Sequence, residues 1–412
     1  MPALSSLPIV AALDHLEAPP DRVSPAPVAQ MVVLSLVEAL AAVPDPRKPR
    51  GVRHGVLAVL LLGACAVLTG ARSFVAVAEY AHDAGRAVLE VLGAGTVVPH
   101  ESTIRRVLQQ IDPEALEAAL QAWALAQLAA RTPQAGIPVR EQRRVFALDG
   151  KTVRGARATS SDSDEPVAAP HLVSVIDQDS GAVLGQVQVD AKGSEIAAFI
   201  TLLDQLDLHE VLISADALHT QRGHARYLHE RGGHYLLTVK ANQPTLLRRL
   251  RALPWSQIEV ANRQQARGHG RVETRAITVV SLARCPDLGG EFFPHAAQAI
   301  KLVRRRRPLS SRKWTTVTVY AITSLTAFQT DPALLARWMR GHWAIEALHW
   351  VRDVSFDEDR SQVRTAHGPQ VMAALRNLAI TALRLSGATN IAAALRHHAR
   401  DTGRPLDTYK IT

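Results

Sequence analysis

The sequence of 412 residues predicts a mixed α/β fold, with one mixed β-sheet covered by helices, an all-helical N-terminal part and a β-rich insertion. Apolar residues recur with helical spacing between residues 31 and 130, and with strand spacing from about residue 139. Across residues 145–240 the expected order is β-β-β-α-β-α-β, which suits a sheet with helices on both faces. This is the strand order of the ribonuclease-H-like fold.

Residues 1–30 are rich in Pro and Ala without a clear period, and we expect a flexible tail there. A helical N-terminal domain is expected over residues 31–135. Its predicted helices cover 31–42, 55–69, 73–92, a segment capped by Ser102 that ends near Ile111, and 113–130. The apolar run 55–71 is shorter than a membrane span and contains three glycines, so a buried core helix is expected and no membrane contact.

Residues 136–244 are predicted to form the first part of the core. A short apolar run, Val145–Leu148, leads into Asp149 and Gly150, and we expect Asp149 at the strand's C-terminal end. A similar run ends at Asp216. The other expected elements are a hairpin of strands 171–176 and 183–189, helices 195–206 and 221–231, and a strand at 235–240.

Residues 245–330 are predicted to be a basic, β-rich insertion, with strands at 275–281, 299–304 and 315–322. Helices over residues 331–390 would then complete the core, and 391–412 would be a polar tail. A helix at 332–353 is opened by Asp331-Pro332. Its polar residues share one face, and they are His342, Glu346, His349, Trp350 and Asp353. The last long helix is expected at 367–385.

The charge of the chain is unevenly distributed. The net charge is +9, and residues 240–315 contain 16 Lys and Arg against 4 Asp and Glu, so the remainder is slightly acidic. A localised basic segment favours a polyanionic partner, nucleic acid first. Two cysteines are too few for a disulfide framework, and no signal peptide is recognisable, which together favour a cytoplasmic protein.

Asp149, Asp216 and Glu346 are the candidate metal ligands. Carboxylates are the ligands preferred by Mg²⁺ and Mn²⁺, and two such ions about 4 Å apart can promote in-line phosphoryl displacement. Each residue has an ordinary structural interpretation: a turn for Asp149, a helix cap for Asp216 and a solvated face for Glu346. The two strand-end aspartates, the later glutamate and the basic segment are more specific together.

Several motifs in order resemble the ISAs1-like (H-repeat-associated) family of DDE insertion-sequence transposases. They are ALDGKTVRGA (147–156), KGSEI (192–196), LLDQLDL (202–208), SADALHTQ (214–221), GGHYLLTVKANQ (232–243), GHGRVETR (268–275) and RGHWAIEALHWVRDVSFDED (340–359). In the helical part, PDPRKPRGVRHG, GARSF and ESTIRRVL resemble the domain associated with that family. The resemblance covers about residues 35–385.

The resemblance implies a catalytic triad of Asp149, Asp216 and Glu346 that binds two Mg²⁺ or Mn²⁺ ions. Related transposases carry Arg and Lys around the glutamate, where this chain has His342 and Asp353. Ala347 and Ser194 also replace the family's usual Asn. These departures leave Glu358 or Asp359 as the fallback third acid.

The implied activity is cleavage of the DNA at the element's ends and transfer of the freed 3′-hydroxyl to target DNA. The expected partners are double-stranded DNA, at the element's terminal repeats and at the target, and further copies of the chain, at least as a dimer. The expected location is the bacterial nucleoid. Expected DNA contacts are Lys151, Lys240, His269, Arg271, Arg304, Arg305, Arg306 and Arg307, with Arg105 and Arg106 on a candidate recognition helix.

Three other functions remain open. Glu79-x-x-His82 and Glu346-x-x-His349 each match half of a di-iron carboxylate site, although the strand-rich middle disfavours a four-helix core. A decayed element could act only as a DNA-binding protein. A stand-alone nuclease of the same fold would hydrolyse DNA without strand transfer.

Overall fold

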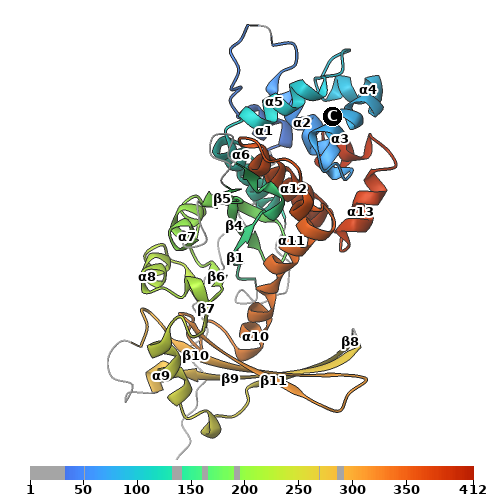
Figure 1. The fold of residues 1–412 in the computed structure, drawn as a ribbon. Helices are drawn as coiled ribbons and strands as arrows, with labels where there is room; N and C mark the ends of the chain where they lie inside the picture. The colour runs from blue at the N-terminus through green and yellow to red at the C-terminus, as the bar shows by residue number, and fades with distance from the viewer. Residues whose placement is uncertain are drawn as a thin grey trace, which may run out of the picture. The chain divides into compact units, whose positions relative to one another are not determined.

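A computed structural model describes residues 33–50, 52–131, 142–159, 166–189, 195–268, 270–284 and 292–412. The expected tail over 1–30 lies outside these ranges. Leu34–Thr412 form one unit, in which many helices accompany a large mixed sheet (Figure 1). The predicted mixed α/β class is confirmed.

Helices account for the N-terminal third of this unit. They are α1 (Leu36–Ala41), α2 (Val56–Leu68), α3 (Phe74–Asp83), α4 (Gly85–Val91), α5 (Glu101–Gln110) and α6 (Pro113–Ala129). The single helix expected at 73–92 is wrong, because Gly85 adopts φ +74° and breaks it. The cap of α5 is His100, whose Nδ1 accepts the N–H of Ser102 at 3.2 Å, so the prediction of Ser102 as the cap is also wrong.

The N-terminal helices share their hydrophobic core with the C-terminal ones. Helix α12 (Gly368–Leu385) is buried along most of its length and packs against α2, α5 and α6. Residues 391–412 are not a tail, since they form α13 (Ile391–His398) and α14 (Arg404–Tyr409). Tyr409 and Ile411 are buried in the same core, and this burial stabilises the C-terminal helices. In the described part of the chain, no helix is long and apolar enough to cross a bilayer.

Nine strands form one mixed sheet in the order β5-β4-β1-β6-β7-β11-β10-β9-β8. The strands are β1 (Val145–Thr152), β4 (His171–Asp177), β5 (Val183–Val189), β6 (Leu212–Ala215), β7 (His234–Val239), β8 (Asn262–Gly268), β9 (Arg271–Ser281), β10 (Gln298–Pro308) and β11 (Thr315–Thr323). A separate pair is formed by β2 (Ala158–Thr159) and β3 (Pro166–Val167). Strands β1, β6 and β7 are parallel, and the other pairings are antiparallel.

The hairpin β4–β5 and the three strands expected in the basic segment are confirmed. These later strands extend the core sheet, because β11 pairs with β7. Figure 1 shows β8–β11 as long, continuous strands beside α9 and α10. Their outer halves are largely exposed, so this part of the sheet presents polar side chains to solvent.

Helices cover both faces of the central strands. Helices α7 (Glu195–Leu203), α8 (Arg222–Glu230) and α9 (Pro244–Ala252) share a core with alternate strand residues such as Phe146 and Ile213. The intervening residues, such as Val145 and Leu212, pack with α10 (Pro332–Gly341). This alternation is the period of two expected for a strand buried on both sides.

Helix α10 is followed at once by α11 (Trp343–Val354), so the continuous helix predicted over 332–353 is interrupted. His342 ends the first helix and begins the second. Gly341 precedes it, and glycine weakens a helix interior by about 1 kcal/mol relative to alanine.

Candidate active site

Asp149 and Asp216 lie at the same level of two adjacent parallel strands. Leu148 of β1 is paired with Ala215 of β6, and Asp149 and Asp216 are the residues that follow them in the chain. The two carboxylates therefore emerge where the parallel pairing ends. Strand β1 continues to Thr152 through its antiparallel pairing with β4, so the prediction that Asp149 closes the strand is wrong.

The Asp216 carboxylate is fixed by the backbone that follows it. Its Oδ1 accepts the N–H of Leu218 at 2.7 Å, as the cap of a short 3₁₀ helix over Ala217–His219. The helix-cap interpretation is therefore correct, and it does not compete with a catalytic role, because the cap engages only one of the two carboxylate oxygens.

Helix α11 brings Glu346 towards the aspartates. It packs against β1, and Glu346 lies in its first turn with an exposed side chain. His349, one turn further on, places its Nδ1 3.7 Å from Oδ2 of Asp149. Trp350 of the same predicted face is 61% exposed, so it does not share the contacts of its neighbours with the sheet.

The pKa of Asp149 is raised to about 7. Burial is the largest cause, and the negative charges of Asp216, Glu195 and Glu346 raise it further, against a backbone hydrogen bond that lowers it. Asp216 and Glu346 therefore lie close enough to Asp149 for their charges to raise its pKa. A fourth carboxylate, Glu195, belongs to the same cluster.

Glu195 was given no role by the sequence analysis, although it lies inside the quoted KGSEI motif. It begins α7, is 3% exposed, and its Oε1 lies 2.6 Å from Nε2 of His171. Its Oε2 lies 3.8 Å from Nε2 of His219. An acidic residue at the start of a helix usually stays at the surface, so the buried histidine partners are what distinguish this one.

Gly150 makes room for this pair. A Cβ at this position would lie 2.5 Å from Nε2 of His171 and 2.7 Å from Cδ of Glu195. Asp149 and Gly150 therefore belong to a strand and do not form a turn. Its glycine is required by the close approach of two buried side chains.

Lys151 lies two residues after Asp149 on β1 and forms ion pairs with carboxylates that follow it in the chain. Its side chain is 7% exposed, and its Nζ lies 2.6 Å from Oδ1 of Asp353 and 3.3 Å from Oδ1 of Asp359. The ammonium group therefore already has carboxylate partners, which leaves it poorly placed for the DNA contact expected from the sequence. Asp353 occupies the position of lysine in related transposases, and here it is paired with the ammonium group of Lys151 on β1.

Glu358 is held by two buried arginines. Arg352 donates to both of its oxygens, at 2.9 and 3.0 Å, and Arg376 donates to Oε1 at 2.9 Å. Burial alone would raise the pKa of Glu358, but the charges of Arg352 and Arg376 lower it to about 2. Because both oxygens are engaged and the residue is fully buried, Glu358 is poorly suited to be the third metal ligand.

Burial lowers the pKa of three histidines around the site, which favours their neutral forms. Burial, followed by the charges of Arg352 and Lys151, lowers the pKa of His349 to about 3. Burial also lowers the pKa of His219 to about 4 and lowers that of His342. His342, which replaces the arginine of related transposases, lies with Nδ1 3.1 Å from Oγ of Ser214. Neutral imidazoles can orient carboxylates without adding positive charge.

Within the described ranges, no three His, Cys, Asp or Glu side chains converge closely enough to hold a metal ion. The donor set itself fits a hard divalent cation, because Asp149, Asp216 and Glu346 supply only oxygen ligands. Burial first, and then the neighbouring carboxylates, raise the pKa of Asp149, and a bound cation would favour its charged form. The di-iron alternative gains no support, because Glu79 and His82 are exposed on α3.

The expected DNA contacts other than Lys151 are dispersed over the surface. Lys240 is exposed after β7, near enough to His342 to contribute to lowering its pKa. Arg271 is exposed at the start of β9, with Nε 3.8 Å from Oε2 of Glu273. His269 lies outside the described residues. Arg105 and Arg106 are both exposed on α5.

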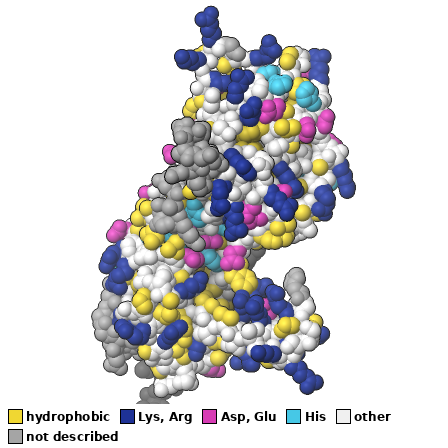
Figure 2. Space-filling view, in the orientation of Figure 1, with side chains coloured by type: hydrophobic (Ala, Val, Ile, Leu, Met, Phe, Trp, Pro, Cys, Tyr) yellow, Lys and Arg dark blue, Asp and Glu magenta, His cyan; other side chains and the backbone are white. Residues whose placement is uncertain are grey.

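The arginine run of β10 does not form one face. Strand alternation sends Arg304 to one side, where its guanidinium lies 5.1 Å from the ring centroid of Trp343. Arg305 and Arg307 lie on the other side, at 5.1 and 5.5 Å from the ring of Trp314. Figure 2 shows Lys and Arg gathered over this strand-rich part, with acidic and histidine side chains between it and the helices.

Comparisons with known proteins identify the family of the chain. Residues 140–382 match the family described as "Transposase DDE domain", and residues 37–124 match "DDE_Tnp_1-associated". The chain is 29% identical over 370 residues to "Putative transposase YncI" of Escherichia coli O157:H7, covering 86% of this chain and 88% of that protein. It is 28% identical over 367 residues to "H repeat-associated putative transposase YhhI" of E. coli K12, covering 86% and 91%.

A solved piggyBac transposase synaptic complex with hairpin DNA matches at a TM-score of 0.38 and 10% identity, over 86% of this chain and 72% of that one. The domain matches define the class, a transposase with a DDE domain. Together with the YncI and YhhI relatives, they show that the chain belongs to the ISAs1-like (H-repeat-associated) family of DDE transposases.

Proposed function

We propose that this transposase cuts DNA at the ends of its insertion element and joins the freed 3′ ends to target DNA. The observation that carries the proposal is the register of β1 and β6, which places Asp149 beside Asp216 with Glu346 close enough to act on the Asp149 charge. Acidic side chains at this edge of a mixed sheet suit a phosphodiester substrate that arrives with divalent cations.

The proposed core is ribonuclease-H-like. Its support is the strand order β5-β4-β1-β6-β7, which by sequence is third, second, first, fourth and fifth. Of these five strands, only β4 runs in the opposite direction to the other four. We further propose the domain limits expected from the sequence: a helical DNA-binding part over 31–135, core segments at 136–244 and 331–390, and the basic insertion at 245–330.

Asp149, Asp216 and Glu346 would hold two Mg²⁺ or Mn²⁺ ions, which would activate the attacking oxygen and stabilise the leaving oxygen. In cleavage, a water oxygen bonds to phosphorus and the bond from phosphorus to the 3′ oxygen breaks. In joining, that 3′-hydroxyl attacks a target phosphodiester and displaces the target's own 3′ oxygen. Asp149 and Asp216 are pre-oriented for this work by β1 and by the cap to Leu218.

The groups around the acids would act as positioning residues. Glu195 and His171 support the backbone at Gly150, and Lys151 ties β1 to α11 through Asp353. Lys240, Arg271 and the arginines of β9 and β10 would contact the DNA backbone as the negatively charged substrate approaches. Paired ends imply at least a dimer on DNA, and the substrate would place the protein at the bacterial nucleoid.

The test is cleavage of a labelled duplex that carries the flanking terminal repeats, with Mg²⁺ or Mn²⁺. Asp149→Asn, Asp216→Asn and Glu346→Gln should each lower the cleavage rate by at least about 1000-fold, since each removes a charge at the reacting centre. Glu230→Gln, an exposed change on α8, should leave it unchanged. Cleavage that survives all three changes would contradict the proposed site.

The same assay separates the open alternatives. Joined products distinguish a transposase from a nuclease. Loss with the aspartate variants but not with Glu346→Gln would move the third acid to Asp359, because Glu358 is engaged by Arg352 and Arg376. Binding of the repeats by the wild type without any cleavage would indicate a decayed element that acts only as a DNA-binding protein.

A further inference from the structure

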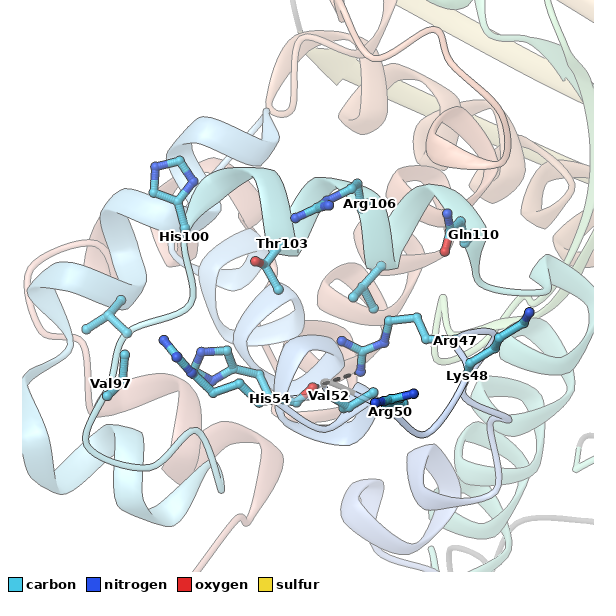
Figure 3. Close-up of a pocket in the computed structure, with 13 residues that line it drawn as sticks. Arg47, Lys48, Arg50, Val52, His54, Val97, His100, Thr103, Arg106 and Gln110 are labelled. Atoms are coloured by element: carbon cyan, nitrogen blue, oxygen red, sulfur yellow. Dashed lines mark hydrogen bonds between the residues drawn. The ribbon is translucent and has the colours of Figure 1, made fainter.

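A basic cavity of about 560 Å³ lies in the helical part of the chain. One wall is the turn between α1 and α2, and the other is helix α5 (Figure 3). Its lining residues include Arg47, Lys48, Arg50, Arg53, His54 and Arg106. Five are Lys or Arg, and the lining residues that the structure describes include no Asp or Glu.

The sequence pattern of α5 explains why the helix presents a polar wall. Ile104 and Leu108 are buried in the shared core, and so is Val107 on its inner side. Thr103, Arg106 and Gln110 recur at helical spacing and line the cavity. Figure 3 shows Thr103, Arg106 and Gln110 along the helix that forms one side of the cavity. Arg106 is braced there, because its Nε donates to the carbonyl oxygen of Ser102 at 2.9 Å.

The opposite wall is held in shape before any ligand binds. Arg47 donates to both carboxylate oxygens of Asp45, at 2.8 and 2.7 Å, and its Nη2 donates to the carbonyl oxygen of His54 at 2.7 Å. Arg47 thus ties the two ends of the turn together. Among described residues Lys48, Arg50 and Arg53 form no ion pair, so their charges are available to a ligand.

His54 supplies an independent sign of a ligand. Its side chain lines the cavity and is only 7% exposed, yet its Nδ1 makes no hydrogen bond with any described residue. A buried polar atom without a partner is costly, by about 1–3 kcal/mol, and such atoms are found where a ligand or water completes the bonding. An anion in the cavity would be within the field of the basic side chains that line it.

We propose that this cavity binds a backbone phosphate of duplex DNA, as a contact separate from the catalytic acids. The proposal rests on the proposed transposase function and gives its helical part a defined phosphate site. It also decides between the two arginines of α5. Arg106 lines the cavity, whereas Arg105 is paired with Glu101 at 3.1 Å and is absent from the lining. Arg106 is therefore the DNA contact, and Arg105 is a surface residue.

The test compares these neighbouring arginines. Binding of a fluorescent terminal-repeat duplex is measured across a series of salt concentrations for the wild type, Arg106→Gln, Lys48→Gln and the matched control Arg105→Gln. Each cavity change should weaken binding several-fold and reduce the slope of log K against log salt by about 1, as loss of one phosphate contact requires. Arg105→Gln should keep the wild-type slope. Equal losses for Arg105→Gln and Arg106→Gln would overturn the assignment.

A second measurement identifies the source of the phosphate. Acetylation of Lys48 is followed by mass spectrometry in the full-length protein, with the duplex or with inorganic phosphate at equal phosphate concentration. Protection by the duplex alone supports a DNA site, and protection by inorganic phosphate alone overturns it. In the Asp149→Asn variant, the duplex should protect Lys48 from acetylation as it does in the wild type. A chain that binds through the cavity but never cleaves would therefore refute the proposed chemistry while leaving this site intact.

Discussion

Nζ of Lys151 lies 2.6 Å from Oδ1 of Asp353, and this ion pair joins strand β1 to helix α11. Strand β1 carries Asp149 and α11 carries Glu346, so the pair links the two elements that supply the proposed metal ligands. The lysine is nearly buried and the aspartate is 34% exposed. An ion pair in this position fixes geometry more than it adds stability, because the cost of desolvation offsets much of the attraction.

Lys151→Met should therefore lower the free energy of unfolding and the cleavage rate, and it should leave DNA affinity nearly unchanged. It would leave Asp353 and Asp359 without their shared cation, and we expect a loss of about 2 kcal/mol in unfolding free energy. Chemical denaturation and duplex binding are measured in parallel with Lys240→Met, an exposed comparison. If Lys151→Met weakens binding as strongly as Lys240→Met without losing stability, Lys151 is a phosphate contact after all.

Glu358 should make the protein sensitive to acid. Its folded pKa of about 2 lies below the ordinary value of 4.5, so the unfolded chain binds the proton more tightly. The stabilisation is fully present above pH 4.5 and is lost as pH falls towards 2, with an upper magnitude of about 3 kcal/mol. The free energy of unfolding, measured between pH 6 and pH 2, should fall less steeply in Glu358→Gln than in the wild type. Parallel curves would show that other groups govern acid unfolding.

Two glycines offer a matched comparison. Gly150→Ala would place a methyl group 2.5 Å from His171 Nε2, and we expect a loss of about 1–3 kcal/mol in unfolding free energy together with slower cleavage. Gly223→Ala lies within α8 with nothing within 4 Å of the new methyl, and it should be neutral or stabilise by up to about 1 kcal/mol. Thermal denaturation of both variants measures the difference. A Gly150→Ala protein as stable as Gly223→Ala would mean that Glu195 and His171 can move apart freely.

The outer arginines of β10 should contribute to DNA affinity. Arg305 and Arg307 lie over Trp314 on one side of the strand, and Arg306 is exposed on the other. Replacing all three with Gln should reduce the slope of log K against log salt by at most about 3. Titration of a duplex at several salt concentrations measures it. Unchanged affinity would restrict the DNA contacts to other basic residues.

Element types could be predicted from the sequence because they depend on local periodicity. The β4–β5 hairpin, the later strands of the basic segment and the buried α2 were all predicted correctly. The errors fall where one residue interrupts a pattern. Gly85 splits one expected helix, and His342 marks a break in another. The C-terminal residues expected as a tail are helical because Tyr409 is buried in the core formed by the N-terminal helices.

The sequence by itself determined the family, the order of the core elements and the three candidate acids. Periodicity, acids after apolar runs and motif order are all properties of neighbouring residues. Only the tertiary structure decided which partners these acids have. It revealed Glu195 beside Asp149, enclosed Glu358 between Arg352 and Arg376, and paired Lys151 with Asp353. Such contacts join residues far apart in the chain, and their energies depend on burial and distance, which no local pattern specifies.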